Sequence, residues 1–174
     1  MTIDPTASWY LPTTPQHMRA EPWLHGDAID YLAGILLMSY RVAEQGSGGS
    51  TLWMAERCRS VVAFEHDPDW YQAVRAKAPR NCTLIPWTAI ERMPELPYKV
   101  DLVLIDGDRE GRRVWLANIR RYLAPSGWIV LDNANRPEYA LERASLGDWC
   151  TLEARFDRNH WNSHYFVTEF WRAK

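Results

Sequence analysis

The stretch YRVAEQGSGGST, residues 40–51, decides the fold class of this sequence. Its first half is a short apolar segment, predicted as a strand over residues 40–44. Its second half is a glycine loop that leads into a predicted helix over residues 50–57. Glycines in such a loop let the backbone come close to a ligand. A strand, a glycine loop and a helix in this order are typical of the ligand-binding edge of an α/β sheet.

The rest of the chain continues this alternation of strand and helix. Strands that are apolar throughout indicate a parallel sheet buried on both faces. The last two strands have no helix between them, which predicts an antiparallel hairpin at one edge. The predicted fold is one doubly wound α/β domain with a seven-stranded, mostly parallel sheet over residues 26–174, after an irregular proline-rich arm over residues 1–25. The further strands are expected over residues 60–65, 82–86, 100–106, 128–131, 151–156 and 164–171, and the further helices over residues 27–37, 69–77, 110–123 and 137–144.

Composition narrows the functional class. The 174 residues carry 20 Lys and Arg against 22 Asp and Glu, a net charge of −2 at pH 7. This balance gives no global attraction to nucleic acid or to an anionic membrane. No apolar run approaches the ~18 residues of a membrane span, and no signal peptide is visible. The three cysteines are too few for a disulfide framework or a zinc site, so we expect a cytoplasmic protein. Because the charge balance disfavours nucleic acid, we expect this protein to act on a small molecule.

Two acidic residues indicate which cofactor the glycine loop binds. Glu65 ends the predicted strand that follows the loop, 17 residues after Gly48, close to the ~20 expected of a carboxylate that binds ribose. Glu44 immediately precedes the loop and would repel the pyrophosphate of a dinucleotide, whereas it attracts the ammonium and sulfonium of S-adenosylmethionine. Ser50 replaces the third glycine of a dinucleotide loop. Under the alternative interpretation, both acids are strand-end carboxylates satisfied by backbone N–H groups.

Four motifs resemble those of class I S-adenosylmethionine-dependent methyltransferases. They are Glu-x-Gly-x-Gly-x-Ser (44–50), the acid Glu65, Leu-Ile-Asp-Gly (104–107) and Leu-Ala-Pro-Ser-Gly-Trp-Ile-Val-Leu-Asp-Asn (123–133). The resemblance covers residues 27–171 and implies a Rossmann-like methyltransferase domain. Gly-Ser-Gly-Gly-Ser-Thr, Phe-Glu-His-Asp-x-x-Trp, Asp-Asn-x-x-Arg-x-x-Tyr and Thr-Glu-Phe-Trp are similar to a group of small predicted methyltransferases. The resemblance implies that Glu44, Gly46 and Gly48 line the methionine end of the cofactor, that Glu65 holds the ribose, and that His66 and Trp87 lie near the adenine. Ser47, Ser50 and Asp106 are further candidate cofactor-binding residues.

The residues after the fourth and fifth predicted strands are candidates for the chemistry. In the catechol and caffeoyl-CoA O-methyltransferases, to which the chain has a weaker resemblance, an Asp and an Asp-Asn pair hold a divalent cation. Asp106, Asp132 and Asn133 match these three positions, and such an all-oxygen set suits Mg²⁺. Arg109 stands where those enzymes have a basic lysine, and Arg does not readily give up a proton. In the alternative, Asp106 contacts cofactor or substrate, while Asp132 and Asn133 hold the neighbouring loops.

Three arginines, Arg109, Arg112 and Arg113, begin the predicted helix after the fourth strand. The helix dipole disfavours cations there, so we expect compensation by Asp108 and Glu110 or by an anionic substrate group. A chain this short has no room for a separate substrate domain. Acceptor recognition is therefore expected from the arm, the loops after strands four and five, residues 158–163 or a second subunit. Four tryptophans in or beside loops are candidate ligand contacts: Trp23, Trp70, Trp87 and Trp161.

The predicted function is S-adenosylmethionine-dependent O-methylation of a small-molecule or sugar-like acceptor, with Asp106 and Arg109 as catalytic residues. The segment 106–109 lacks the Pro-Pro-aromatic signature of methyltransferases that act on adenine or amide nitrogen. A second hypothesis is a cofactor-binding or scaffolding subunit without turnover. A nucleotide-dependent oxidoreductase is a third, which Glu44 disfavours.

Overall fold

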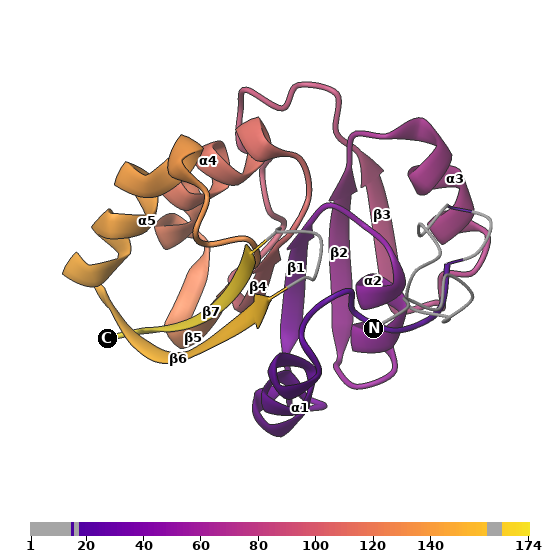
Figure 1. The fold of residues 1–174 in the computed structure, drawn as a ribbon. Coiled ribbons are helices and arrows are strands. Elements are labelled where there is room, and N and C mark those ends of the chain that lie inside the picture. Colours follow the sequence, from indigo (N-terminus) through magenta and orange to yellow (C-terminus); the bar gives the residue numbers. More distant parts are fainter. Residues whose placement is uncertain (1–14, 16–17, 160–164) are drawn as a thin grey trace, which may run out of the picture.

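A computed structural model of the chain describes residue 15 and residues 18–159 and 165–174. As predicted, its sheet has seven strands, and their order is β3-β2-β1-β4-β5-β7-β6 (Figure 1). The strands are β1 (Arg41–Gln45), β2 (Ser60–Glu65), β3 (Cys82–Pro86), β4 (Val100–Ile105), β5 (Leu123–Leu131), β6 (Cys150–Asn159) and β7 (Tyr165–Ala173). The helices are α1 (Gly26–Ile35), α2 (Gly49–Ala55), α3 (Pro68–Arg75), α4 (Arg109–Asn118) and α5 (Ala140–Ser145), with short 3₁₀ helices η2 (Ile119–Arg121), η3 (Pro137–Tyr139) and η4 (Leu146–Asp148).

The strand order places a crevice at the carboxyl end of β1. β1 pairs in parallel with β2 on one side and with β4 on the other, so the chain leaves these strands toward opposite edges of the sheet. Ligands of open α/β sheets bind at such a switch point. The hairpin of β6 and β7 adds to β5 in antiparallel fashion, as predicted, and closes the sheet on the side away from β3.

Both faces of the sheet are buried, which explains why its central strands are apolar throughout. On one face Ala43 and Val103 pack with Trp115 of α4. On the other face Val42 and Leu104 pack with α1 and α2. Because side chains alternate along a strand, neighbouring residues of β1 belong to different cores. Glu44 and Gln45, at the end of β1, therefore project on opposite sides of the crevice.

Several predicted boundaries were wrong. The helix expected over residues 110–123 ends at Asn118, and β5 already begins at Leu123. The register of β4 against β5 shifts between Val100 and Leu102, and Ser126 has a φ of 57°, so the irregularity accommodates a proline and a glycine inside the strand. The N-cap of α1 is His25, whose Nδ1 accepts a hydrogen bond from the backbone N–H of Asp27, and not Asp27 itself. That helix also ends two residues early, at Ile35.

The described part of the arm, residues 18–25, packs closely on α2. A Cβ on Gly49 would lie 2.1 Å from the carbonyl oxygen of Arg19 and 2.4 Å from that of Glu21, so this contact requires glycine. Met18 and Leu24 are buried on either side of it. The arm is thus fixed across the amino end of α2, next to the glycine loop. The remaining arm residues lie outside the described part of the chain.

Within the described residues, every helix is too short or too polar to cross a bilayer.

Candidate active site

A cavity of about 1080 Å³ opens at the carboxyl ends of β1, β2, β4 and β5. Typical small-molecule sites measure about 300–1,000 Å³, so this one has room for a cofactor and an acceptor together. Its walls come from the arm, the start of α1, the glycine loop, the loops after β2, β4 and β5, and the start of β7. The predicted site residues that line it are Glu44, Gly46, Ser47, Gly48, Ser50, Glu65, His66, Asp106, Arg109, Asp132 and Asn133.

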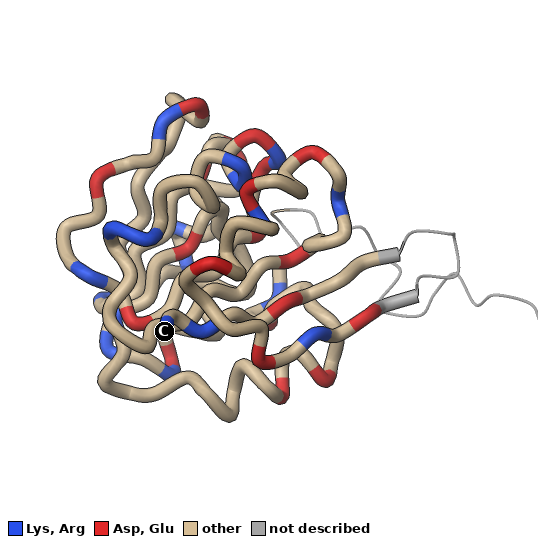
Figure 2. Tube along the Cα trace, turned by 90° about the vertical axis from the view of Figure 1, so that its left-hand side faces the viewer, with Lys and Arg blue, Asp and Glu red and all other residues tan. Residues whose placement is uncertain are grey.

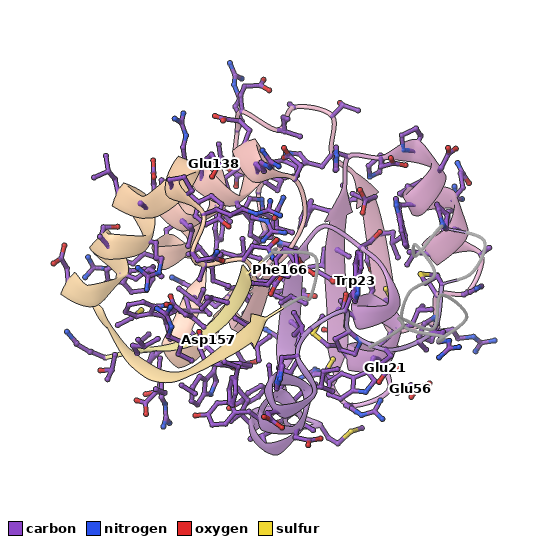
Figure 3. All side chains as sticks on the ribbon, viewed as in Figure 1. Glu21, Trp23, Glu56, Glu138, Asp157 and Phe166 are labelled. Atoms are coloured by element: carbon purple, nitrogen blue, oxygen red, sulfur yellow. The ribbon has the colours of Figure 1, made fainter. Side chains whose placement is uncertain are left out.

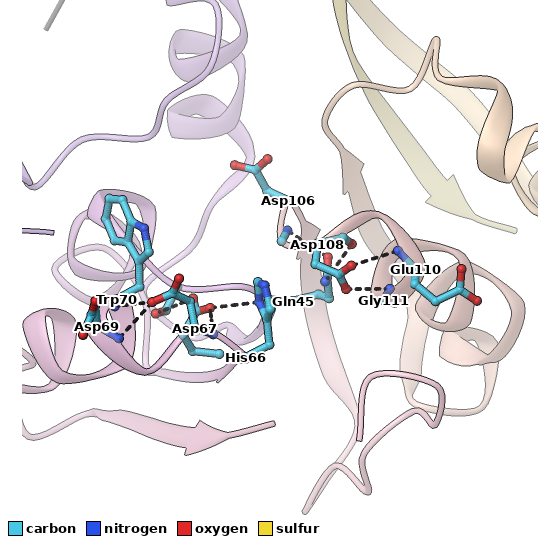
Figure 4. A network of polar contacts seen from close by, with 12 residues as sticks. Gln45, His66, Asp67, Asp69, Trp70, Asp106, Asp108, Glu110 and Gly111 are labelled. Carbon is cyan, nitrogen blue, oxygen red and sulfur yellow. Dashed lines mark hydrogen bonds and ion pairs between the residues drawn. The ribbon is translucent and has the colours of Figure 1, made fainter. Parts of the chain in front are cut away.

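The glycine loop packs directly against the loop that follows β4. Gly46 has a φ of 102°, and a Cβ there would lie 2.9 Å from the Cα of Gly107. The buried Gln45 side chain joins the two loops, because its Oε1 accepts from the N–H of Gly107 (2.8 Å) and its Nε2 donates to the carbonyl of Asp108 (3.3 Å; Figure 4). Sequence reasoning missed Gln45, although a polar residue at the end of an apolar strand was a usable signal. Gln45 sets the spacing between the cofactor loop and Asp106.

Glu44 is a buried acid without a cationic partner in the described chain. Its Oε2 accepts from the hydroxyl of Thr51 (2.6 Å), and its Oε1 accepts from that of Ser50. Burial, together with the carboxyls of Asp106 and Glu65, raises the pKa of Glu44 to about 8. The hydrogen bonds from the two hydroxyls oppose this rise. A protonated acid at a cavity wall becomes a favourable anion when a cation binds beside it. The site therefore fits the positively charged methionine end of S-adenosylmethionine.

Glu65 lies at the other side of the glycine loop. Its Oε2 accepts from the hydroxyl of Ser47 (2.9 Å), its Oε1 accepts from the N–H of Asp67 (2.9 Å), and Nδ1 of His66 is 3.1 Å from Oε1. The structure thus brings Ser47, Glu65 and His66 together. Asp67 caps α3 by accepting from the N–H groups of Asp69 and Trp70, which places Trp70 in the cavity wall (Figure 4). This arrangement offers one carboxylate to a diol, as ribose binding requires.

We expect Glu65→Ala to weaken S-adenosylmethionine binding by about 10- to 150-fold. The loss of hydrogen bonds to a charged group costs about 1.5–3 kcal/mol. Isothermal calorimetry measures the effect. The matched control is Glu56→Ala, which removes an exposed glutamate that pairs with Arg57 at the far end of α2 (Figure 3). Equal affinities of the Glu65→Ala variant and the wild type would show that Glu65 does not hold the ribose.

Trp87 is placed differently from the other predicted cofactor residues. Its ring is buried in the core, where it packs edge-on against Trp115 with centroids 6.1 Å apart, and its Nε1 donates to the carbonyl of Arg92 (3.0 Å). Only its backbone approaches the site, through a hydrogen bond to the carbonyl of Glu65 (2.7 Å). The residue after β3 turns inward because the core there is aromatic. The Trp87 ring is therefore absent from the lining of the described cavity.

The floor of the cavity holds an acid pair bound to a buried arginine. The guanidinium of Arg112 donates to Oδ1 of Asp106 (2.9 Å), to the carbonyl oxygens of Asp106 and Gly107 (both 2.8 Å) and to that of Asp132. Oδ1 of Asp132 accepts from the hydroxyl of Thr168 on β7 (2.7 Å). Burial and the neighbouring Asp132 raise the pKa of Asp106 to about 7, against the opposing effect of Arg112. The sequence alone did not distinguish Arg112 from Arg109 and Arg113.

The arginines at the start of α4 are compensated within the chain. Arg113 pairs with Glu110 (3.0 Å), as predicted, and Arg109 with Glu138 (3.3 Å). The expectation for Asp108 was wrong, because its carboxylate caps α4 by accepting from the N–H groups of Glu110 and Gly111 (Figure 4). Arg109 is 67% exposed at the rim of the cavity, and its recorded ion pair is with Glu138, away from the acid pair.

Arg136, from the loop after β5, also lines the cavity. It is half-buried, and burial together with the charges of Arg112 and Arg109 lowers its pKa. Tyr139, three residues further on, is buried and donates to the carbonyl of Asn133 (2.5 Å), which fixes this loop against β5. Arg136 is therefore held at the cavity on a firmly anchored turn.

The residues present do not fit a divalent cation well. One oxygen of Asp106 is held by Arg112 and one of Asp132 by Thr168, and the buried guanidinium would repel a second cation. Among the described residues, no cluster of three His, Cys, Asp or Glu side chains has the geometry of a metal site. Arg112 already supplies one positive charge beside Asp106.

We accordingly expect the midpoint of thermal unfolding to be the same in millimolar MgCl₂ as in EDTA. A ligand that binds the folded state raises this midpoint, so a cation held by the acid pair would be visible by differential scanning fluorimetry. A rise that disappears in Asp132→Ala would contradict this expectation and restore the predicted metal site.

The comparisons with known proteins agree with this geometry. Residues 43–134, more than half of the chain, match the family model described as a methyltransferase domain. The chain belongs to this family. The matched segment contains the glycine loop, Glu65 and the acid pair with its arginine. A search of curated proteins finds no match.

Solved methyltransferases share the fold of this family member. They include an rRNA methylase from Streptococcus thermophilus (17% identity, TM-score 0.65, 93% of this chain and 98% of that one). The N-methyltransferase NodS from Bradyrhizobium japonicum, in complex with S-adenosyl-L-homocysteine, is also similar (16%, 0.62, 88% and 92%). The third is a precorrin-6y C5,15-methyltransferase from Geobacter metallireducens (16%, 0.63, 90% and 93%). At these identities the likeness concerns the fold, and their acceptors differ in kind.

Proposed function

We propose that this methyltransferase transfers the methyl group of S-adenosylmethionine to an oxygen atom of a small-molecule acceptor, with Asp106 as the base. The observation that carries the proposal is the state of Asp106. Its side chain is about a quarter exposed, at the floor of the cavity, and its pKa is raised to about 7. A general base works best when its pKa lies near the operating pH.

The cofactor would be held by residues on two sides of the glycine loop. Glu44 fits the ammonium group and the loop backbone the methionine end, while Glu65 and His66 fit the ribose and the base next to it. When bound, S-adenosylmethionine supplies an electrophilic methyl group on a sulfonium. Trp70 and the arm also line the cavity.

The chain's own residues then hold the acceptor proton. A carboxylate oxygen of Asp106 would accept the proton of the acceptor hydroxyl. The methyl group would pass to the oxygen of that hydroxyl, the carbon–sulfur bond would break, and S-adenosylhomocysteine would be the leaving group. Arg112 holds the other oxygen of Asp106 from below, so the carboxylate is fixed in direction. Methyl transfer is an in-line displacement that depends mainly on such alignment. In this scheme Arg112 balances the charge of Asp106.

A small molecule is favoured over nucleic acid by charge. The net charge is −2, and basic and acidic residues alternate along the chain in Figure 2 without a continuous basic block in that view. Proteins that bind nucleic acid commonly present a basic stripe to the phosphates. An RNA acceptor, as in the rRNA methylase of the same fold, is the competing outcome of the experiment below.

The experiment uses purified protein and S-adenosylmethionine with a deuterated methyl group. One reaction receives a small-molecule extract and a second receives total RNA, and mass spectrometry locates the label. We expect a labelled ether or ester in the first reaction and none in the RNA. Label on RNA or on nitrogen would contradict the proposal. Tight binding of S-adenosylhomocysteine without label in either reaction would favour a non-catalytic subunit.

A further inference from the structure

We propose that the methyl acceptor is a planar molecule with one anionic group, a carboxylate or a phosphate, and that Arg136 binds this group at the rim of the cavity. The inference rests on the proposed function, since it names the class of acceptor for the same site. It is drawn from the charges and the apolar surfaces on the acceptor side of the cavity.

The acceptor end of the cavity carries arginines as well as acids. Glu44 and Glu65 stand at the proposed cofactor end, which suits a cation, whereas Arg109, Arg112 and Arg136 stand beside Asp106, Asp108 and Asp132 at the proposed acceptor end. The charge of Arg109 is balanced by Glu138, and that of Arg112 by Asp106. A cationic cofactor and an anionic acceptor would match this division.

Arg136 differs from the other two arginines at this end. Its guanidinium makes no ion pair with any side chain in residues 18–157 or 166–174. Asp132 attracts it electrostatically, although no ion pair joins the two side chains. Partial burial of a cation beside other cations costs free energy unless an anion pairs with it. The loop that carries Arg136 is fixed by Tyr139, so the guanidinium is presented to a ligand at low entropic cost.

Apolar side chains from three elements line the same cavity. Trp23 of the arm, Ile29 of α1 and Phe166 of β7 all line it. Trp23 is 64% exposed, although Leu24 beside it is buried and Glu21 packs on Gly49, so the chain on both sides holds the ring at the rim. Trp23 belongs to the arm and Phe166 to β7, and both line the cavity (Figure 3). Aromatic faces of this kind suit a planar acceptor body.

The test measures binding of three probes to the protein saturated with S-adenosylhomocysteine. The probes are 1-naphthoate, 1-naphthyl phosphate and the neutral 1-naphthylmethanol. Calorimetry measures the binding of each. We expect at least one anionic probe to bind roughly tenfold or more tightly than the neutral probe, as a charge-assisted contact provides. The stronger of the two anions identifies the group. Trp23→Ala should weaken all three probes alike.

Variants of Arg136 test whether this residue causes the preference for the anionic probe. Arg136→Gln should lower the affinity of the anionic probe to that of the neutral one, and Arg136→Lys should restore part of it. Arg80→Gln, at an exposed turn after α3, is the matched control and should change nothing. Equal binding of charged and neutral probes, or a preference that survives in Arg136→Gln, would overturn the inference. A wild type that does not bind S-adenosylhomocysteine would instead contradict the proposed function.

Discussion

Replacing Asp106 with Asn is expected to lower kcat by at least about 100-fold, because general bases contribute about 10²- to 10⁴-fold. The amide keeps an oxygen that can accept from Arg112, but it cannot take the proton of the acceptor hydroxyl. Affinity for S-adenosylhomocysteine should change little, and calorimetry on the same sample shows that the variant is folded. The measurement is single-turnover transfer of labelled methyl to the acceptor found by the experiment above.

The pH profile of the wild type gives an independent readout. Because the base acts as a carboxylate and its pKa is about 7, kcat/KM should rise as the pH increases through 7 and then reach a plateau. Asp106→Asn should lose this rise. The matched control is Glu138→Gln, which removes the carboxylate paired with Arg109 at the rim and should keep both rate and profile (Figure 3). Full activity of Asp106→Asn at every pH would mean that another group accepts the proton.

The sequence reveals the cofactor side of this site because its signal is local. Glu44, the glycine loop and Glu65 follow each other within residues 44–65, and each stands where an apolar strand stops. A strand end fixes a position in space, because the carboxyl ends of parallel strands meet at one edge. The fold class and the cavity position follow from the same pattern. Only the direction of a ring such as Trp87 depends on what the core around it contains.

The acceptor side depends on contacts that no local pattern encodes. Arg112 is one of three arginines in a helix start, and only the packing of α4 on β4 and β5 decides that this one is buried against Asp106. Thr168 reaches Asp132 from 36 residues away. The early start of β5 has the same origin, since a bulge against β4 makes a strand out of residues that favour a turn. Tertiary contacts override local preference in each case.

Replacing Glu44 with Gln is expected to change how stability depends on pH. The pKa of Glu44 is about 8 in the folded chain and near 4.5 in the unfolded chain. Between these values the folded state keeps a proton that the unfolded state has lost, so the free energy of unfolding falls by about 1.4 kcal/mol per pH unit through this group. Below pH 4.5 and above pH 8 the contribution is flat. Urea unfolding from pH 5 to 8 should show a smaller decline in Glu44→Gln than in the wild type.

Cofactor binding should reverse the protonation of Glu44. An ammonium group beside it favours the carboxylate, so S-adenosylhomocysteine binding at pH 7 should release about one proton and tighten as the pH rises toward 8. Calorimetry in phosphate and in Tris separates the heat of this proton from the heat of binding. Glu44→Gln keeps acceptors and donors for Ser50 and Thr51 but has no charge. It should release no proton and bind about 10- to 150-fold more weakly.

Glu21→Gln is the control for this result. It removes an exposed carboxylate from the same cavity and should leave the proton release intact. Equal heats in the two buffers for the wild type would mean that the ammonium group binds elsewhere and that Glu44 only holds the hydroxyls of Ser50 and Thr51. Proton release that is lost in Glu44→Gln alone would place the positive end of the cofactor at this buried acid. Burial disfavours the charged form of Glu44 unless a cation lies beside it. This would then explain why the site binds a cationic ligand in preference to a phosphate.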